Sequence, residues 1–257
     1  MSPGDGPVAA RPVGNYSVRS ALAQVALTGL EDRKPGQLSG GQRQRVALAR
    51  AIVIRPAVLL CDEPLGARDR KLRQQLQFES KQLQKEIGVT LLFVTHDQEE
   101  ALAMSDRIAV MRAGRIEQVG APRQIYHAPT TEFVASFVGI TNVLAGTVHQ
   151  RQGAEADVLV GGSLVRVRTV RPVGTPVTLS LRPEALRVLR PGETASPGCR
   201  LLSGTLEETE YLGAVTRFSV RLAGGLPLQV MVLGRLIGRG EMFLAYDPLD
   251  VAVLEGP

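Results

Sequence analysis

Residues 38–45 read Leu-Ser-Gly-Gly-Gln-Arg-Gln-Arg, and an apolar-periodic run continues from them to Ile54. Ser39 is a good helix cap, and the glycines Gly40 and Gly41 let another molecule approach the backbone closely. The first N–H groups of such a helix lie at the positive end of its dipole, which suits a phosphate. The stretch therefore predicts a helix start that can contact an anion, although a plain capping turn would show the same pattern.

A short apolar strand that ends in two acids follows. Residues 57–61 are apolar and lead directly into Asp62 and Glu63. Because ligands of α/β sheets bind at the carboxyl ends of the strands, we expect both carboxylates at the functional edge. Asp62 is a suitable ligand for Mg²⁺, which takes oxygen ligands. Glu63 is a suitable base to accept a proton from a water that attacks a phosphoryl group. A solvated strand end is the simpler alternative.

A second apolar strand, residues 91–95, ends in His96. We expect this histidine to emerge at the same sheet edge as Asp62 and Glu63. A lone histidine there would be an ordinary polar strand-end residue. Together with the glycine-rich helix start, however, the three elements describe a site that hydrolyses a phosphoanhydride.

The chain changes character near Gly139. Before it, helical periodicity alternates with short apolar runs, which is typical of an α/β domain. After it, short strand-like segments are separated by Gly and Pro turns, which predicts a small barrel or sandwich. The expected elements of the first part are a strand over 108–111, a hairpin of 107–112 and 115–119, and helices over 70–87, 122–126 and 131–138. The expected strands of the second part are 143–148, 158–160, 164–168, 177–181, 216–220, 226–230, 241–245 and 251–254.

Composition narrows the class of protein. Apolar residues make up 44% and charged residues 21% of the 257 residues, which excludes wholesale disorder. No apolar run approaches the ~20 residues that cross a bilayer, and no signal peptide is expected at the N-terminus. Cys61 and Cys199 lie far apart, which suits a reducing compartment. We expect a soluble cytosolic chain.

Charge and aromatic content argue against nucleic acid as a partner. The net charge of +5 is spread along the chain, aromatic residues are 4%, and tryptophan is absent. Stacking platforms for single strands are therefore scarce, and the half after residue 138 is nearly neutral.

Three motifs together resemble a known family. Residues 38–45, 59–64 and 94–101 look like the signature motif, the Walker B motif and the switch histidine of ABC-transporter ATPase subunits. Residues 106–120 and 122–139 continue the likeness. The second half resembles the transport-associated OB-type domain, in particular Ser-Leu-Arg-Pro-Glu at 180–184 and Glu-Tyr-Leu-Gly at 210–213. The nearest class is the ATPase of spermidine/putrescine importers.

The resemblance implies a fold and a function. Residues 1–138 would be an α/β P-loop-type ATPase fragment, the C-terminal half of a nucleotide-binding domain, and residues 139–257 an all-β OB-like barrel domain. The chain would energise uptake of a small-molecule solute of the polyamine class, with ATP and Mg²⁺ as cofactors. Its partners would be membrane permease subunits and another ATPase subunit in a homo- or heterodimer. It would be a cytoplasmic protein, bound peripherally to the inner face of the cell membrane.

The resemblance also assigns roles to single residues. Asp62 would support Mg²⁺, Glu63 would be the catalytic base and His96 would sense the γ-phosphate. The residues assigned to contacts across the dimer, with the nucleotide of the opposing subunit, are Ser39, Gly40, Gly41, Gln42 and Asp69. The string Gly-Ala-Arg-Asp at 66–69 departs from the family's usual Ser-Ala-Leu-Asp. The helix before the signature motif would span residues 19–30.

One expected motif is missing from the sequence. A P-loop needs Gly-Lys-Ser/Thr, so that backbone N–H groups and a lysine cradle the phosphates. None of the four lysines, Lys34, Lys71, Lys81 and Lys85, follows a glycine. We therefore expect the isolated chain to hydrolyse ATP negligibly. A truncated or mis-started reading frame and a split subunit completed by a separate P-loop polypeptide both explain the pattern. The alternative from another class is a non-catalytic binding or regulatory remnant, whose OB-like tail binds a small ligand or partner.

Overall fold

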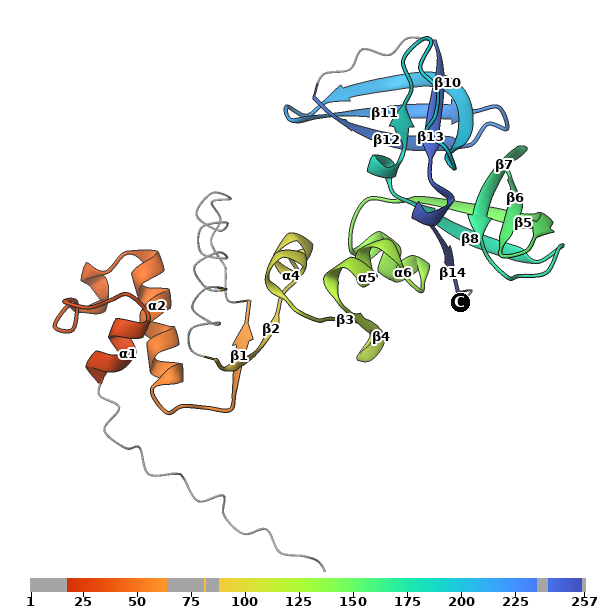
Figure 1. Ribbon diagram of the computed structural model, residues 1–257. Coiled ribbons are helices and arrows are strands. Elements are labelled where there is room, and N and C mark those ends of the chain that lie inside the picture. The colour runs from red at the N-terminus through yellow and green to blue at the C-terminus, as the bar shows by residue number, and fades with distance from the viewer. Residues whose placement is uncertain (1–17, 64–80, 82–87, 235–239, 256–257) are drawn as a thin grey trace, which may run out of the picture. The chain divides into compact units, whose positions relative to one another are not determined.

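The structure is a computed structural model that describes residues 18–63, 81, 88–234 and 240–255. Two compact units, Met1–Met104 and Ser105–Pro257, make up the chain (Figure 1). The domain boundary expected at 138/139 lies inside the second unit and stays a prediction. The helix expected over 70–87 and the site residue Asp69 lie outside the described residues, apart from Lys81 of that helix.

The first unit places two helices against one face of a small parallel sheet. Strand β1 pairs with β2, with Leu60 opposite Leu92 and Asp62 opposite Val94, so the carboxyl ends of both strands meet at one edge. Residues of α1, α2 and β1, including Ile52 and Leu59, form its core. Both strand predictions are thus confirmed. The elements are α1 (Val18–Gln24), a 3-10 helix (Pro35–Gln37), α2 (Gly40–Ile52), β1 (Val58–Asp62), β2 (Thr90–Val94) and α4 (Gln98–Met104).

Helix α1 is shorter than the resemblance implies. It ends at Gln24, and Ala26 and Gly29 both adopt positive φ, 56° and 82°. A positive φ is incompatible with a right-handed helix, so the expected helix over 19–30 is wrong in its second half.

The second unit opens with a hairpin and two short helices. Ala113 and Gly114, which join β3 to β4, have φ of 49° and 76°. A two-residue type I′ hairpin turn requires positive φ at both positions. The hairpin prediction is therefore confirmed, and so are both helices. The elements are β3 (Ile108–Arg112), β4 (Arg115–Gly120), α5 (Pro122–His127) and α6 (Glu132–Phe137).

Two five-stranded antiparallel sheets follow and share one hydrophobic core. Alternate residues of both sheets point inward, such as Val158 and Leu179 in one and Phe218 and Leu244 in the other, all fully buried. One sheet has the order β14 (Val251–Leu254), β8 (Pro176–Leu181), β5 (Asn142–Gln152), β6 (Glu155–Val160) and β7 (Ser163–Arg168). The other has the order β12 (Pro227–Leu233), β11 (Val215–Leu222), β10 (Arg200–Tyr211), β13 (Glu241–Tyr246) and β9 (Arg187–Val188).

Each of the eight strands expected here overlaps an observed strand, which fits an OB-like β domain. The sequence reasoning missed β9 and β10. Strand β10 carries Gly204 in its interior and an irregular register between Leu206 and Glu208, and its exposed stretch is rich in Glu and Thr. These features hide the usual strand pattern.

Candidate functional site

Glu63 and His96 meet at the carboxyl edge of the β1–β2 pair. The Nδ1 atom of His96 lies 2.9 Å from Oε1 of Glu63. Both side chains are exposed to solvent, and Asp62 is exposed beside them at the end of β1. The structure therefore brings the histidine to the acidic pair, with the reactive groups of both residues open to an approaching molecule.

The backbone of Glu63 is held in an unusual conformation. Its φ is 44°, in the left-handed region that residues other than glycine rarely occupy. Its N–H donates to the carbonyl oxygen of Val94 at 2.9 Å, which ties it to the neighbouring strand. Backbone strain of this kind persists where surrounding structure enforces it, and it gathers at functional sites.

The loop that carries His96 is fixed by a buried glutamate. Glu100 is 3% exposed, and its Oε2 accepts a hydrogen bond of 2.6 Å from the hydroxyl of Thr95. That hydroxyl accepts in turn from the N–H of Asp97, whose carboxylate caps the N–H of Glu100. Sequence reasoning did not single out Glu100, although an Asp followed three residues later by a Glu is a helix-start signal that would have found it.

Ser39 begins α2 as expected. Its Oγ accepts from the N–H of Gln42 at 3.2 Å, and Oε1 of Gln42 accepts from the N–H of Ser39 at 2.9 Å, a reciprocal cap. The N–H groups of Gly40 and Gly41 are among those that helix geometry leaves without an intrahelical acceptor. A side chain added at Gly40 would meet no atom within 4 Å, so this helix end is open to another molecule.

The structure does not bring all predicted site residues together. Among the described residues, no hydrogen bond joins the Ser39–Gln42 cap to Asp62, Glu63 or His96. Cys61 directly precedes Asp62 in β1. Burial raises the pKa of the Cys61 thiol, which fits a core residue rather than a reactive one.

The residues that are present fit the two implied cofactors, Mg²⁺ and ATP, to different degrees. In the part of the chain that the structure describes, no group of three or more His, Cys, Asp or Glu side chains is arranged to hold a metal ion. Magnesium bound with nucleotide needs only one or two carboxylates, because phosphates and water supply the remaining oxygens, and exposed Asp62 fits that need. ATP finds a weaker fit, since the sequence contains no Gly-Lys-Ser/Thr phosphate cradle.

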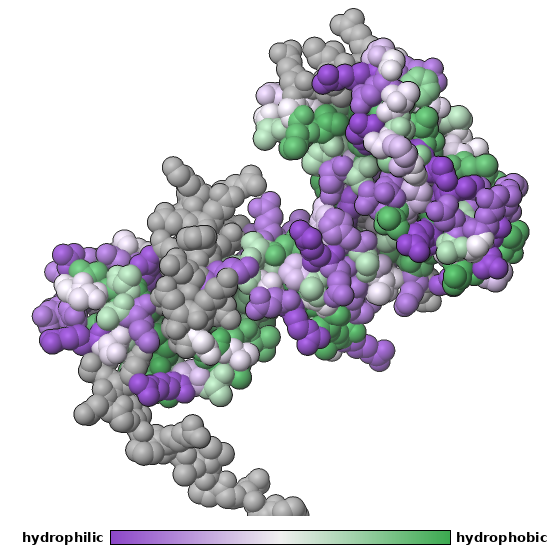
Figure 2. Space-filling model, in the orientation of Figure 1, coloured by the Kyte–Doolittle hydropathy of each residue, from purple (hydrophilic) through white to green (hydrophobic). Residues whose placement is uncertain are grey.

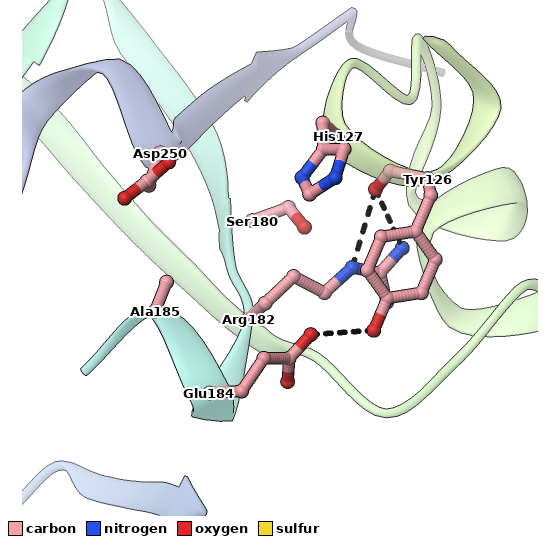
Figure 3. A pocket seen from close by; sticks show the side chains of 7 residues that line it. All are labelled: Tyr126, His127, Ser180, Arg182, Glu184, Ala185 and Asp250. Carbon is pink, nitrogen blue, oxygen red and sulfur yellow. Dashed lines mark hydrogen bonds between the residues drawn. The ribbon is translucent and has the colours of Figure 1, made fainter. Parts of the chain in front are cut away.

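The second unit contains a cavity of about 190 Å³, shown in Figure 3. Arg182 in this cavity is 4% exposed, and its guanidinium donates to the carbonyl oxygens of Tyr126, Ala135 and Ile140. The Tyr126 hydroxyl donates to Glu184, and burial raises the pKa of Tyr126 to about 12. The charged guanidinium of Arg182 thus anchors the C-terminal ends of α5 and α6, and the cavity lies among these contacts. It is lined by Tyr126, His127, Ser180, Arg182, Glu184, Ala185 and Asp250.

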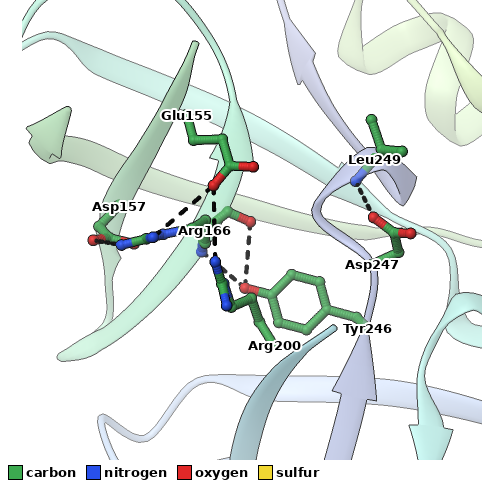
Figure 4. A network of polar contacts seen from close by, with 7 residues as sticks. All are labelled: Glu155, Asp157, Arg166, Arg200, Tyr246, Asp247 and Leu249. Atoms are coloured by element: carbon green, nitrogen blue, oxygen red, sulfur yellow. Dashed lines mark hydrogen bonds and ion pairs between the residues drawn. The ribbon is translucent and has the colours of Figure 1, made fainter. Parts of the chain in front are cut away.

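A polar network joins the two large sheets of this unit (Figure 4). Arg166 on β7 donates to Asp157 on β6 at 2.7 and 2.5 Å, which lowers the pKa of that carboxyl. The backbone N–H of Arg166 donates to the hydroxyl of Tyr246 on β13, and Arg200 on β10 lies 3.8 Å from Glu155. The network fixes one sheet against the other.

Two protein families match parts of the chain. The ABC transporter family matches residues 10–66, and the TOBE domain matches residues 179–249. The first match includes Ser39, Gln42, Asp62 and Glu63, and the second includes Arg182. Among the described residues, no helix is long and apolar enough to cross a membrane.

Curated relatives align with most of the chain. A protein of Rubrobacter xylanophilus named "Spermidine/putrescine import ATP-binding protein PotA" is 50% identical over 222 residues, which is 83% of this chain and 57% of that protein. A protein of Escherichia coli named "Uncharacterized ABC transporter ATP-binding protein YdcT" is 48% identical over 212 residues, 82% of this chain and 55% of that protein. The chain thus spans little more than half the length of these relatives.

A solved structure is similar over a smaller part. It is described as cbiO1 from Clostridium perfringens, part of the ABC transporter complex cbiONQ. The two are 33% identical over 42% of this chain and 43% of that chain, with a TM-score of 0.40.

Proposed function

We propose, since the chain combines part of an ABC transporter ATPase domain with a TOBE domain, that it serves in the ATP-hydrolysing subunit of a solute importer. The solute class is the polyamines, because relatives about half identical to this chain are named spermidine/putrescine import proteins. The subunit would act at the cytoplasmic face of the cell membrane, bound to permease subunits and paired with a second ATPase subunit.

The observation that supports this proposal most is the contact between Glu63 and His96. An exposed carboxylate at the carboxyl edge of a parallel pair is placed to accept a proton from water, and Nδ1 of His96 at 2.9 Å holds its orientation. When bound, ATP with Mg²⁺ supplies the phosphoanhydride and the charge that polarises it. Asp62 would hold the metal through an oxygen ligand.

The Ser39 cap would serve the opposite subunit. The Ser39 hydroxyl, the N–H groups of Gly40 and Gly41 and the side-chain amide of Gln42 can all donate to a phosphate oxygen. Within the described residues, no hydrogen bond joins the cap to Glu63 or His96, which agrees with a role at a neighbour's nucleotide. Asp69, outside the described residues, belongs to the same proposed interface.

The proposal predicts one outcome for the chain alone and another for a mixture. Alone, the chain has the strand edge with Glu63 and His96 but no Gly-Lys-Ser/Thr motif to hold the phosphates, so it should hydrolyse ATP negligibly. Mixed with an intact ABC importer ATPase whose catalytic Glu is changed to Gln, it should associate with that protein when ATP is present, and Ser39→Ala should weaken the association.

Light scattering with and without nucleotide measures that association. Lys34→Ala serves as a matched control, because Lys34 is also exposed near the start of α2 but belongs to no proposed contact. Association that is the same with and without nucleotide would count against the proposed dimer. So would equal association by Ser39→Ala and the unaltered chain. Turnover by the chain alone at the rate of an intact relative would count against the half-site.

The alternative of a ligand-binding remnant depends on the cavity beside Arg182. Because Tyr126, Arg182 and Glu184 in that cavity already bond to one another or to backbone carbonyls, the ATPase proposal is the better supported of the two.

A further inference from the structure

His96 lies between two residues that one side chain holds in place. The carboxyl group of Glu100 accepts a hydrogen bond from the hydroxyl of Thr95, the residue before His96, at 2.6 Å, which is short for a bond between two oxygens. The same hydroxyl accepts from the N–H of Asp97, the residue after His96, at 3.0 Å. Glu100 therefore fixes Thr95, and through Thr95 it fixes the backbone on both sides of the histidine.

The imidazole of His96 has little else to hold it. Its side chain is 82% exposed, and within the described residues its hydrogen bond to Glu63 is the only one that the ring makes. An exposed side chain changes rotamer freely unless its backbone and its neighbours restrict it. The orientation of Nδ1 towards Oε1 of Glu63 thus depends on how the backbone around His96 is held.

The stability of the fold does not explain why a glutamate occupies position 100. Figure 2 shows hydrophilic residues at the surface of the first unit, where charged side chains ordinarily lie. Glu100 is 3% exposed instead, and in the part of the chain that the structure describes its Oε1 atom has no hydrogen-bond partner. A buried polar atom without a partner costs free energy, which an apolar side chain of similar size would avoid. Proteins keep such local costs mainly at functional sites.

The start of helix α4 does not need this side chain either. The carboxylate of Asp97 accepts from the N–H of Glu100 at 3.1 Å, and that bond uses only the backbone of Glu100. Any residue other than proline at position 100 would keep this cap, because only proline lacks the N–H. The contact with the Thr95 hydroxyl is therefore the one that requires the carboxyl group of Glu100.

We propose that Glu100 is a positioning residue for the contact between His96 and Glu63: through Thr95, it holds the imidazole so that Nδ1 faces the Glu63 carboxylate. This inference rests on the proposed function, in which Glu63 accepts a proton from the attacking water. Glu100 touches neither that water nor a phosphate. Its contribution is that Glu63 is already oriented when a nucleotide binds.

NMR of the three histidine side chains in the full chain tests the positioning without any nucleotide. His96→Gln identifies the signals of His96. At a pH at which the imidazole is neutral, the contact with Glu63 should keep the proton on Nδ1, because a carboxylate only accepts hydrogen bonds. Glu63→Ala should abolish this preference for Nδ1, and it therefore shows the size of a complete loss.

Two pairs of variants separate the hydrogen bond from other effects. Glu100→Leu and Thr95→Val should each lose the preference for Nδ1 as completely as Glu63→Ala does. Glu100→Gln keeps an acceptor and Thr95→Ser keeps the hydroxyl, so both should retain the preference. Urea denaturation should show no loss of stability in Glu100→Leu, which distinguishes positioning from a purely structural role. Gln98→Ala, at an exposed residue of the same helical turn, is the matched control and should change nothing.

Several results would overturn the proposal. They are no preference for Nδ1 in the unaltered chain, an unaltered preference in Glu100→Leu, and a loss in Glu100→Gln as large as that in Glu100→Leu. If Glu100→Leu does not fold, Thr95→Val and Thr95→Ser decide between them, and equal spectra for these two would reject the role of the hydroxyl.

Turnover is a separate measurement, made in a mixture with a polypeptide that carries a P-loop. There, Glu100→Leu should lower kcat about tenfold and leave the KM for ATP unaltered, because it disturbs the orientation of the base rather than the binding of nucleotide. A kcat equal to that of the unaltered chain would count against the positioning role. If no mixture hydrolyses ATP, the proposed function fails, and the spectra still decide whether Glu100 positions His96.

Discussion

The two units of this chain differ in how completely they bury their apolar residues. In the second unit, two five-stranded sheets enclose a single core in which Phe218, Val158 and Leu179 are fully buried. In the first unit, half of the apolar side chains of β1 and β2 remain in solvent. The second unit is a domain that its own residues can stabilise. By contrast, the described residues of the first unit, which holds Asp62, Glu63 and His96, leave more of their apolar strand residues exposed.

The largest expected effect concerns the core of the second unit. Phe218→Ala should lower its free energy of unfolding by about 3–5 kcal/mol, because it removes a fully buried aromatic ring. Leu60→Ala in the first unit should change the stability of the isolated chain by less than about 0.5 kcal/mol, since the side chain is exposed. Urea denaturation followed by circular dichroism compares them. Similar losses for both would abolish the contrast between the units.

A pH effect is also expected in the second unit. Burial raises the pKa of Tyr246 to about 12 in the folded state, against about 10 when unfolded. Above pH 10 the unfolded chain has lost this proton and the folded chain keeps it, so stability should fall by about 2–3 kcal/mol between pH 10 and 12. Hydrogen exchange should show the loss in the β sheets, and Tyr246→Phe should remove about half of the slope, because the pKa of Tyr126 is also raised to about 12. An unchanged slope in that variant would assign the effect to other groups.

Glycines test how tightly each unit is packed. A Cβ at Gly224 would overlap the carbonyl oxygen of Gly161, whereas one at Gly40 meets nothing within 4 Å. Gly224→Ala should therefore cost about 1–3 kcal/mol, and Gly40→Ala should leave stability almost unaltered. Thermal denaturation measures both. A stable Gly224→Ala protein would show that the turns of the second unit can move apart.

The smallest effect is expected at the helix cap of the first unit. Ser39→Ala removes the acceptor for the N–H of Gln42 and should destabilise α2 by about 1 kcal/mol, while Ser39→Thr keeps a capping hydroxyl. Hydrogen exchange of the first turn of α2 reports on this directly. If Ser39→Ala exchanges no faster than Ser39→Thr, the cap has no stabilising role.

Local signals in the sequence predicted much of this structure. The cap at Ser39, the Ala-Gly turn of β3–β4 and the meeting of Glu63 with His96 all follow from short patterns or from the shared edge of parallel strands. The positive φ of Glu63 and the anchoring of α5 and α6 by Arg182 could not be predicted, because they depend on residues distant in the sequence. Strand β10 was missed for a similar reason, since its pairing with β11 and β13 overrides a weak local pattern.

ATP turnover by the reconstituted site tests the central claim most directly. The account predicts negligible turnover by this chain alone, measurable turnover when a separate polypeptide that carries a P-loop completes the site, and loss of that turnover in Glu63→Gln. Turnover by the mixture that persists in Glu63→Gln would contradict the account, because hydrolysis would then not depend on the edge where Glu63 meets His96.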